Sequence, residues 1–182
     1  KLDKKALNQA LLCGAHGTGK SFLGWQILKR YYERGSKIAV FVMDEYNRHD
    51  SLVLMRKLLG KAMLCDDPLA DPEALNGFLQ ENLDELEIQM LQKALGLREM
   101  ESGLPDDGNK KLELLVSSLY KSFQKLISGY EAILLDNAQW LDDLSLQVLG
   151  RRLKDKSRLS ELLILTGDEH FPQQVEVSNK RS

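Results

Sequence analysis

The residues with the clearest chemical potential lie in one glycine-rich segment near the start of the sequence. Residues 14–21 read GAHGTGKS and fit the spacing G-x-x-x-x-G-K-[ST]. Glycines in such a segment let backbone N–H groups surround an anion, and the helix that follows presents its positive end to the same charge. The lysine reaches the outer phosphates and the serine hydroxyl binds Mg²⁺. The spacing therefore predicts a phosphate-binding loop in which Lys20 and Ser21 take these two roles.

Several positions of this segment have individual expectations. We expect Gly17 and Gly19 to stand where the backbone needs a positive φ or where a side chain would collide. We expect the side chain of His16 to face outward. The predicted nucleotide-binding residues form one run: Gly14, Ala15, His16, Gly17, Thr18, Gly19, Lys20, Ser21 and Phe22.

The elements around the loop have the pattern that such a site requires. Residues 10–13 form a short apolar run typical of a buried strand, and residues 20–33 have apolar side chains at helical spacing. Gly35 follows that helix, and residues 37–43 (KIAVFVM) are typical of a strand covered on both faces. A right-handed crossover then places both strands in one parallel sheet.

A carboxylate from a neighbouring strand is the second half of a Mg²⁺ site. Residues 132–135 (AILL) are an apolar strand, and Asp136 follows at its carboxyl end. Open parallel sheets bind ligands at the carboxyl ends of their strands, where the glycine-rich loop also lies. We therefore assign Asp136 to magnesium, through a water molecule.

The remaining pattern predicts a helical insertion after the second strand. Residues 51–128 contain no clear strand, and their amphipathic segments predict helices that pack on one side of the sheet. A further helix and a further strand are predicted at residues 143–152 and 161–165. The predicted fold is a three-layer α/β P-loop NTPase with a mainly parallel sheet. The helices of the insertion are expected at residues 52–64, from Asp71 onward, at 84–97 and at 111–127, with an acidic loop at 101–109.

Composition limits the class of protein. The 182 residues fit one α/β domain, and 25 basic against 27 acidic residues give a net charge of -2 with no nucleic-acid footprint. No apolar stretch has the length of a membrane helix, so no membrane partner is expected. Cys13 and Cys65 lack metal-ligand spacing, and Cys13 is expected to be a buried free thiol, which suits an intracellular compartment, cytoplasmic or nuclear. Because the chain opens on Lys1, we interpret it as a fragment of a larger protein.

The segment around Asp136 carries a resemblance to a known group. Residues 133–149 (ILLDNAQWLDDLSLQVL) are similar to the hhhhD-[DE]-x-Q-W-x-D-x-x-S-x-x-x-L stretch of AAA+/STAND-type signalling ATPases. Such modules occur in large transcriptional regulators and beside soluble adenylyl cyclase domains. The resemblance also covers GAHGTGKS and the strand LLILTGDE. It implies an ATP- or ADP-binding, Mg²⁺-dependent switch with protein partners or self-association, completed by a helical lid that these 182 residues lack.

Two departures from that pattern concern hydrolysis. The group usually has an acid directly after the magnesium Asp, where it polarises the attacking water, but this sequence has Asn137. An amide orients water and cannot take its proton. The group also tends to carry an arginine after the fourth strand, where this sequence has Thr166-Gly167-Asp168, leaving Thr166 as the polar sensor. The candidate catalytic residues are thus Lys20, Asn137 and Thr166, and slow or impaired ATPase activity is expected.

Two other interpretations remain open. In a RecA-like ATPase, Glu45 at the end of the second strand would be the catalytic base, and that strand would lie next to the loop strand. In the AAA+-like interpretation the second strand lies beyond the Asp136 strand, and Glu45 is a solvated strand end. The third interpretation is a degenerate domain that only binds proteins. Arg151 and Arg152 are expected on a solvated helix face rather than as a trans-acting arginine finger.

Overall fold

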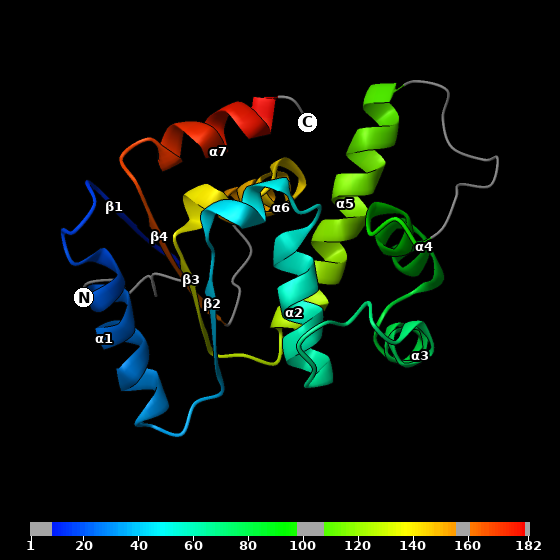
Figure 1. Cartoon of the computed structure of the whole chain (residues 1–182), viewed down its shortest axis with the longest axis horizontal. Coiled ribbons are helices and arrows are strands. Elements are labelled where there is room, and N and C mark those ends of the chain that lie inside the picture. Colours follow the sequence, from blue (N-terminus) through cyan, green and yellow to red (C-terminus); the bar gives the residue numbers. More distant parts are fainter. Residues whose placement is uncertain (1–8, 98–107, 156–160, 181–182) are drawn as a thin grey trace, which may run out of the picture.

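Four short apolar strands form one parallel sheet at the centre of the molecule (Figure 1). The computed structural model describes residues 9–97, 108–155 and 161–180. The order of the strands across the sheet is β1-β4-β3-β2, and every pair is parallel. The strands are β1 (Gln9–Cys13), β2 (Ile38–Val42), β3 (Ala132–Asp136) and β4 (Leu162–Gly167).

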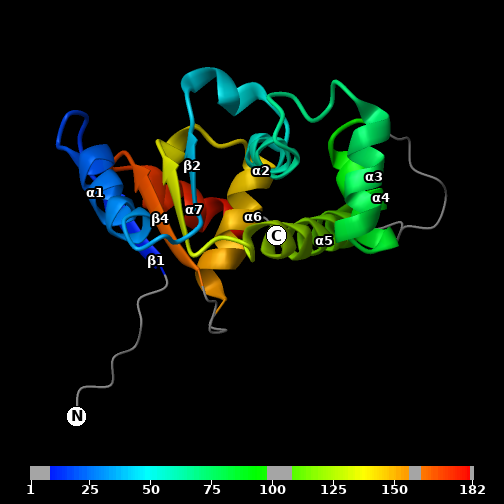
Figure 2. The same ribbon diagram turned by 90° about the horizontal axis from the view of Figure 1, so that it is seen from below.

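Helices cover the two faces of this sheet unequally (Figures 1 and 2). Within the described chain, α1 alone packs on one face, and α2, α5, α6 and α7 lie on the other. Helices α3 and α4 lie farther out, where α4 packs on α5. The helices are α1 (Lys20–Tyr32), α2 (Val53–Met63), α3 (Pro72–Asn82), α4 (Glu85–Ala94), α5 (Gly108–Ile127), α6 (Asp143–Lys154) and α7 (Phe171–Lys180), with short 3-10 turns η1 (Glu45–His49) and η2 (Ala138–Trp140).

The alternation of strand side chains divides the core between the two faces. On the α1 side, Leu28 packs with Leu134 of β3 and Ile164 of β4. On the opposite side, the neighbouring strand residues join a larger cluster with the insertion helices. The contact with α1 is close because a Cβ added to Gly24 would lie 2.9 Å from Leu134 Cδ1. A small residue at this position therefore sets the distance between α1 and the sheet.

The architecture agrees with the sequence in most respects. All four predicted strands are present, and the described part of residues 51–128 is helical, without a strand. Strand β2 pairs with β3 and not with β1, as the AAA+-like interpretation requires. Three details were wrong: α4 ends at Ala94, three residues before its predicted end, α5 begins at Gly108, three residues before its predicted start, and α7 was not predicted. Of the predicted acidic loop, residues 101–107 lie outside the described residues.

One carboxylate links the insertion helix α2 to helix α6. Asp142 accepts hydrogen bonds from Leu144 N and Ser145 N, both at 3.1 Å, and so caps α6. Its other oxygen accepts from Val53 N at 3.0 Å, in the first turn of α2. Helix α2 has no side-chain cap of its own, because Leu52 occupies the N-cap position in the left-handed region at φ 55. The buried Asp142 therefore caps two helices that are far apart in sequence.

Replacing Asp142 tests whether its carboxylate caps both helices. Asp142→Ala removes the cap of α6 and leaves the buried Val53 N–H without its acceptor, so we expect a loss of about 2–4 kcal/mol in the free energy of unfolding. Urea denaturation measures the loss. The control is Asp143→Ala, an exposed acid in the same helical turn, for which a loss of no more than about 1 kcal/mol is expected. Equal losses for the two variants would contradict the double cap.

Candidate functional site

The glycine-rich segment forms the connection between β1 and α1. Gly17 and Gly19 adopt φ values of 79° and 82°, in the left-handed region that favours glycine. A Cβ at either position would meet nothing within 4 Å. Of the two reasons expected for these glycines, the structure supports the backbone conformation and not steric crowding. Gly19 is also the N-cap of α1, so the loop leads directly into the positive end of that helix.

The side chain of Lys20 folds back over the loop. Its Nζ donates to Gly14 O at 2.9 Å and to Ala15 O at 2.7 Å. Thr18 Oγ donates to Ala15 O at 2.9 Å, which closes the same turn. The ammonium group is thus held beside the backbone that the motif predicts to surround phosphate.

Three predicted residues from three elements converge at the carboxyl ends of the strands. Ser21 Oγ, in the first turn of α1, donates to Asp136 Oδ1 at 2.8 Å. Thr166 Oγ, on β4, donates to the same oxygen. Asp136 is only 6% exposed and Thr166 is fully buried. The structure therefore joins the predicted metal ligands, Ser21 and Asp136, and brings the predicted sensor Thr166 to the same carboxylate.

Asn137 is held by one hydrogen bond from its backbone and one from its side chain. Its φ of 58° lies in the left-handed region, and its N–H donates to Thr166 Oγ at 2.9 Å. Its side-chain Nδ2 donates to Met43 O at 3.4 Å, just beyond the end of β2. The amide of the predicted catalytic residue is therefore turned toward β2. Sequence reasoning did not identify this contact, because the partner is a backbone carbonyl that no side-chain pattern marks.

Glu45 lies at the start of η1, two residues after Met43. Its side chain is exposed, as expected for a solvated strand end. Asp44 before it accepts from Asn47 N and caps the turn. Strands β3 and β4 separate β2 from the loop strand β1. This strand order is the opposite of what the RecA-like interpretation required for Glu45.

Two of the predicted nucleotide-binding residues and the predicted buried thiol have exposed side chains. His16 is exposed, as expected, and Phe22 is 68% exposed on α1. The prediction that Cys13 is a buried thiol was wrong, because its side chain is exposed. Cys13 ends β1, which lies at the edge of the sheet formed by the described strands and is covered less than an interior strand would be. An apolar run alone cannot distinguish an edge strand from a central one.

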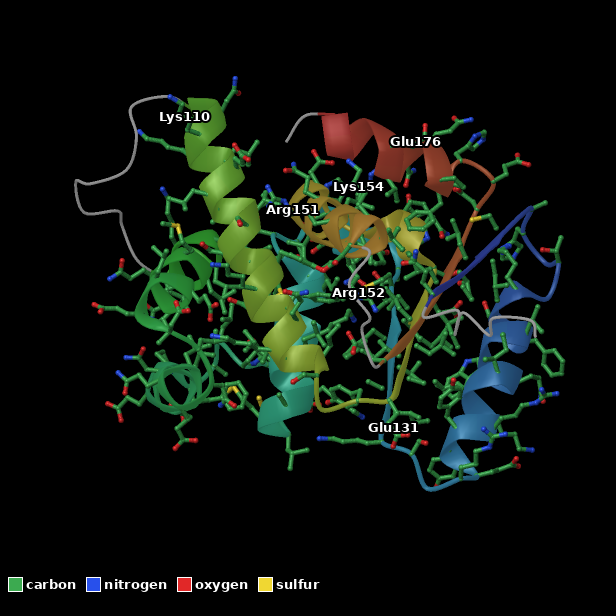
Figure 3. All side chains as sticks on the ribbon, turned by 180° about the vertical axis from the view of Figure 1, so that it is seen from behind. Lys110, Glu131, Arg151, Arg152, Lys154 and Glu176 are labelled. Atoms are coloured by element: carbon green, nitrogen blue, oxygen red, sulfur yellow. The ribbon has the colours of Figure 1, made fainter. Side chains whose placement is uncertain are left out.

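The expectation of a solvated face at Arg151 and Arg152 was also wrong for one of them (Figure 3). Arg152 is 2% exposed, and its Nη2 lies 3.6 Å from Oε1 of Glu161, the residue directly before β4. The same nitrogen donates to Glu161 O at 3.4 Å. A buried guanidinium needs such a partner because desolvating a lone charge is costly. Arg152 therefore joins α6 to β4 and is not available as a surface group.

The donor chemistry of the site is compatible with magnesium. A hydroxyl and a carboxylate are hard oxygen ligands, and Mg²⁺ is commonly held by one or two carboxylates together with phosphates and water. Among the residues that the structure describes, no group of three or more His, Cys, Asp or Glu side chains could hold a metal ion. The paired oxygens of Ser21 and Asp136 thus fit Mg²⁺ only when a phosphate and water complete its shell.

Comparison of the chain with protein-family models, with curated proteins and with solved structures gives no match. None of the helices in the described part of the chain is long and apolar enough to cross a membrane.

The thiol of Cys13 reports on the charges around the loop. Partial burial raises its pKa above the ordinary 9.0, the negative charge of Asp168 raises it further, and Lys20 opposes both. A negative neighbour disfavours the thiolate, so Asp168→Asn is expected to lower the pKa of Cys13. The pH dependence of iodoacetamide labelling, in a Cys65→Ser background, measures this.

Alkylation of Cys13 in Asp168→Asn should therefore begin at lower pH than in the parent. The side-chain oxygen of the introduced asparagine can still accept a hydrogen bond from His170 N, so the turn before α7 is kept. The control is Glu169→Gln, which removes the same charge from the next position. A labelling profile that responds equally to both substitutions would contradict a specific effect of Asp168.

Proposed function

We propose that this chain binds ATP, or its product ADP, together with Mg²⁺ on residues 14–22, and acts as a nucleotide-dependent switch within a larger protein. The observation that carries the proposal is the hydrogen bond between Ser21 Oγ and Asp136 Oδ1. It joins the last residue of a phosphate-loop motif to an acid at the carboxyl end of a parallel strand. Two residues that the sequence assigned to one Mg²⁺ site, 115 positions apart, thus meet in space.

Each residue of the site has a distinct role in this proposal. The N–H groups of the loop and the start of α1 bind the phosphates. Lys20 neutralises the outer phosphates, and Ser21 and Asp136 hold Mg²⁺, Asp136 through water. When bound, Mg²⁺ would neutralise charge on the phosphates. Thr166 orients the Asp136 carboxylate by donating to its Oδ1.

Slow hydrolysis follows from the same geometry. Asn137 occupies the position that would need a general base, and an amide has no such capacity. Its side chain donates to Met43 O, which turns it toward β2. The strand order also places Glu45 on the far side of two strands from the loop strand. The proposal therefore favours a protein that holds nucleotide over one that consumes it rapidly, with partners or self-association providing the output.

The resemblance to AAA+/STAND-type signalling ATPases supports this reading. The sheet order agrees with it, since β2 lies beyond the Asp136 strand. The RecA-like alternative would need Glu45 close to the γ-phosphate, and the strand order weighs against that. The alternative of a degenerate domain that only binds proteins predicts no dependence of nucleotide affinity on Lys20. Adenine is favoured over guanine because the sequence lacks the N/T-K-x-D string typical of guanine selectivity.

The first test of this proposal is nucleotide affinity. Lys20→Ala removes the charge that contacts the outer phosphates, so the Kd for Mg-ATP should rise by about 10- to 100-fold. Isothermal titration calorimetry measures the Kd for each variant. Lys29→Ala is the matched control, because this lysine lies on the same helix and pairs with Glu33 at the surface. Equal Kd values for the parent and Lys20→Ala would overturn the site.

A second test concerns the hydrolysis step. A carboxylate at position 137 supplies the missing base, so Asn137→Glu should raise single-turnover hydrolysis by about tenfold or more. Glu45→Gln should leave the rate of the parent unchanged. Rapid mixing with radiolabelled ATP measures both rates at saturating nucleotide. An unchanged rate in Asn137→Glu together with loss of hydrolysis in Glu45→Gln would instead identify Glu45 as the base.

A further inference from the structure

Strand β2 has an open edge. Its inner edge pairs with β3: Glu131 N donates to Lys37 O at 2.8 Å, and Met43 N donates to Asp136 O at 2.9 Å. Backbone groups of a parallel strand alternate between its two neighbours, so the N–H and C=O groups of Val40 face the other way. In the part of the chain that the structure describes, no strand pairs with that side of β2. An unpaired edge of this kind is a template for another strand.

A groove runs beside this edge. It has a volume of about 440 Å³, and its walls are β2 and the end of α2 with the turn that follows. Lys57 and Lys61 lie in its lining, together with the single acid Asp66. The two lysines are one helical turn apart, and neither forms an ion pair with any described residue. The groove is therefore positively charged on the α2 side of the sheet.

The opposite side of the same edge is apolar. Val40 packs with the cluster beneath α1, and Val42, two residues on, faces the same way with 50% of its surface exposed. Trp25 and Tyr32 are also exposed. They share a flank of α1 with Ser21, because residues four and seven apart lie on one side of a helix. Ser21 contacts β3, the strand next to β2.

We propose that the edge of β2 binds an extended acidic segment of a partner protein as a fifth strand of the sheet. Backbone hydrogen bonds to Val40 would provide the pairing. Side chains of an added strand alternate between the two faces. One set would meet Lys57 and Lys61, so it should be acidic, and the other would lie on the face that carries Val40 and the exposed Val42, so it should be apolar. The partner segment therefore alternates acidic and apolar residues.

Charge favours this partner over a second copy of the chain. Two β2 edges related by a two-fold axis normal to the sheet would pair antiparallel and bring both α2 helices to the same side. Lys57 and Lys61 of each copy would then lie close to those of the other, and like charges repel. An acidic strand meets the same lysines with complementary charge. The open edge of β1 lacks this groove, since Lys57 and Lys61 lie on the far side of the sheet.

Strand binding at the β2 edge does not depend on the proposed nucleotide site, so it is tested without nucleotide. The probe is a fluorescein-labelled nine-residue peptide of alternating glutamate and valine, titrated with the chain and followed by fluorescence anisotropy. Two control peptides carry lysine in place of glutamate, or N-methyl groups on alternate backbone amides. We expect saturable binding of the first peptide, at least about tenfold tighter than either control.

Variants of the chain localise the binding. Lys57→Glu with Lys61→Glu should lower the affinity for the glutamate peptide by at least about tenfold and raise the affinity for the lysine peptide. Lys110→Glu with Lys111→Glu makes the same change of charge at the start of α5 (Figure 3 labels Lys110). This control variant should bind both peptides as the parent chain does. Val40→Pro removes an N–H group that points away from β3 and makes no hydrogen bond to it. The substitution should therefore abolish peptide binding and leave the circular dichroism spectrum of the chain unchanged.

Three results would overturn the inference. The first is the absence of saturable binding by the glutamate peptide. The second is binding that the N-methylated peptide reproduces, because this would show that no backbone pairing occurs. The third is a concentration-dependent dimer in light scattering that Val40→Pro dissociates and the peptide does not, because the edge would then bind a second copy.

Discussion

The carboxylate of Asp136 holds together the parts of the molecule that converge at the site. One of its oxygens accepts hydrogen bonds from Ser21 on α1 and from Thr166 on β4, while its own backbone belongs to β3. The start of α1, strand β3 and strand β4 are thus joined by a single nearly buried group. Hydrogen bonds to a charged acceptor are stronger than those between neutral groups. The same carboxylate that would serve Mg²⁺ also orders the protein around it.

The connection after Asp136 extends this order to the insertion. Asn137 bonds to Thr166 and to the end of β2, and Asp142, at the end of the same connection, caps both α6 and α2. A short segment therefore contacts the site at one end and the helical insertion at the other. A shift of residues 137–141 would therefore change hydrogen bonds both at the site and at the start of the insertion.

Much of this arrangement could be predicted because local patterns determine it. The apolar runs of the strands, the glycine spacing and the acid after β3 each have a physical cause within a few residues. The convergence of Ser21 and Asp136 also followed, because parallel strands end at one edge of a sheet. What could not be predicted depends on contacts between distant residues. The burial of Arg152 requires Glu161, and the exposure of Cys13 requires knowing that β1 lies at an edge.

The position of β1 has a consequence for how the site is assembled. β1 pairs only with β4 among the described strands, so Gln9 meets Leu163 from nearly the other end of the chain. Contacts between such distant residues carry a large loop-closure entropy and form slowly. The glycine-rich loop follows directly from β1, so it is anchored only once this distant pairing exists. Under the proposed function, a ligand that binds this loop only in the completed sheet would stabilise that sheet by mass action.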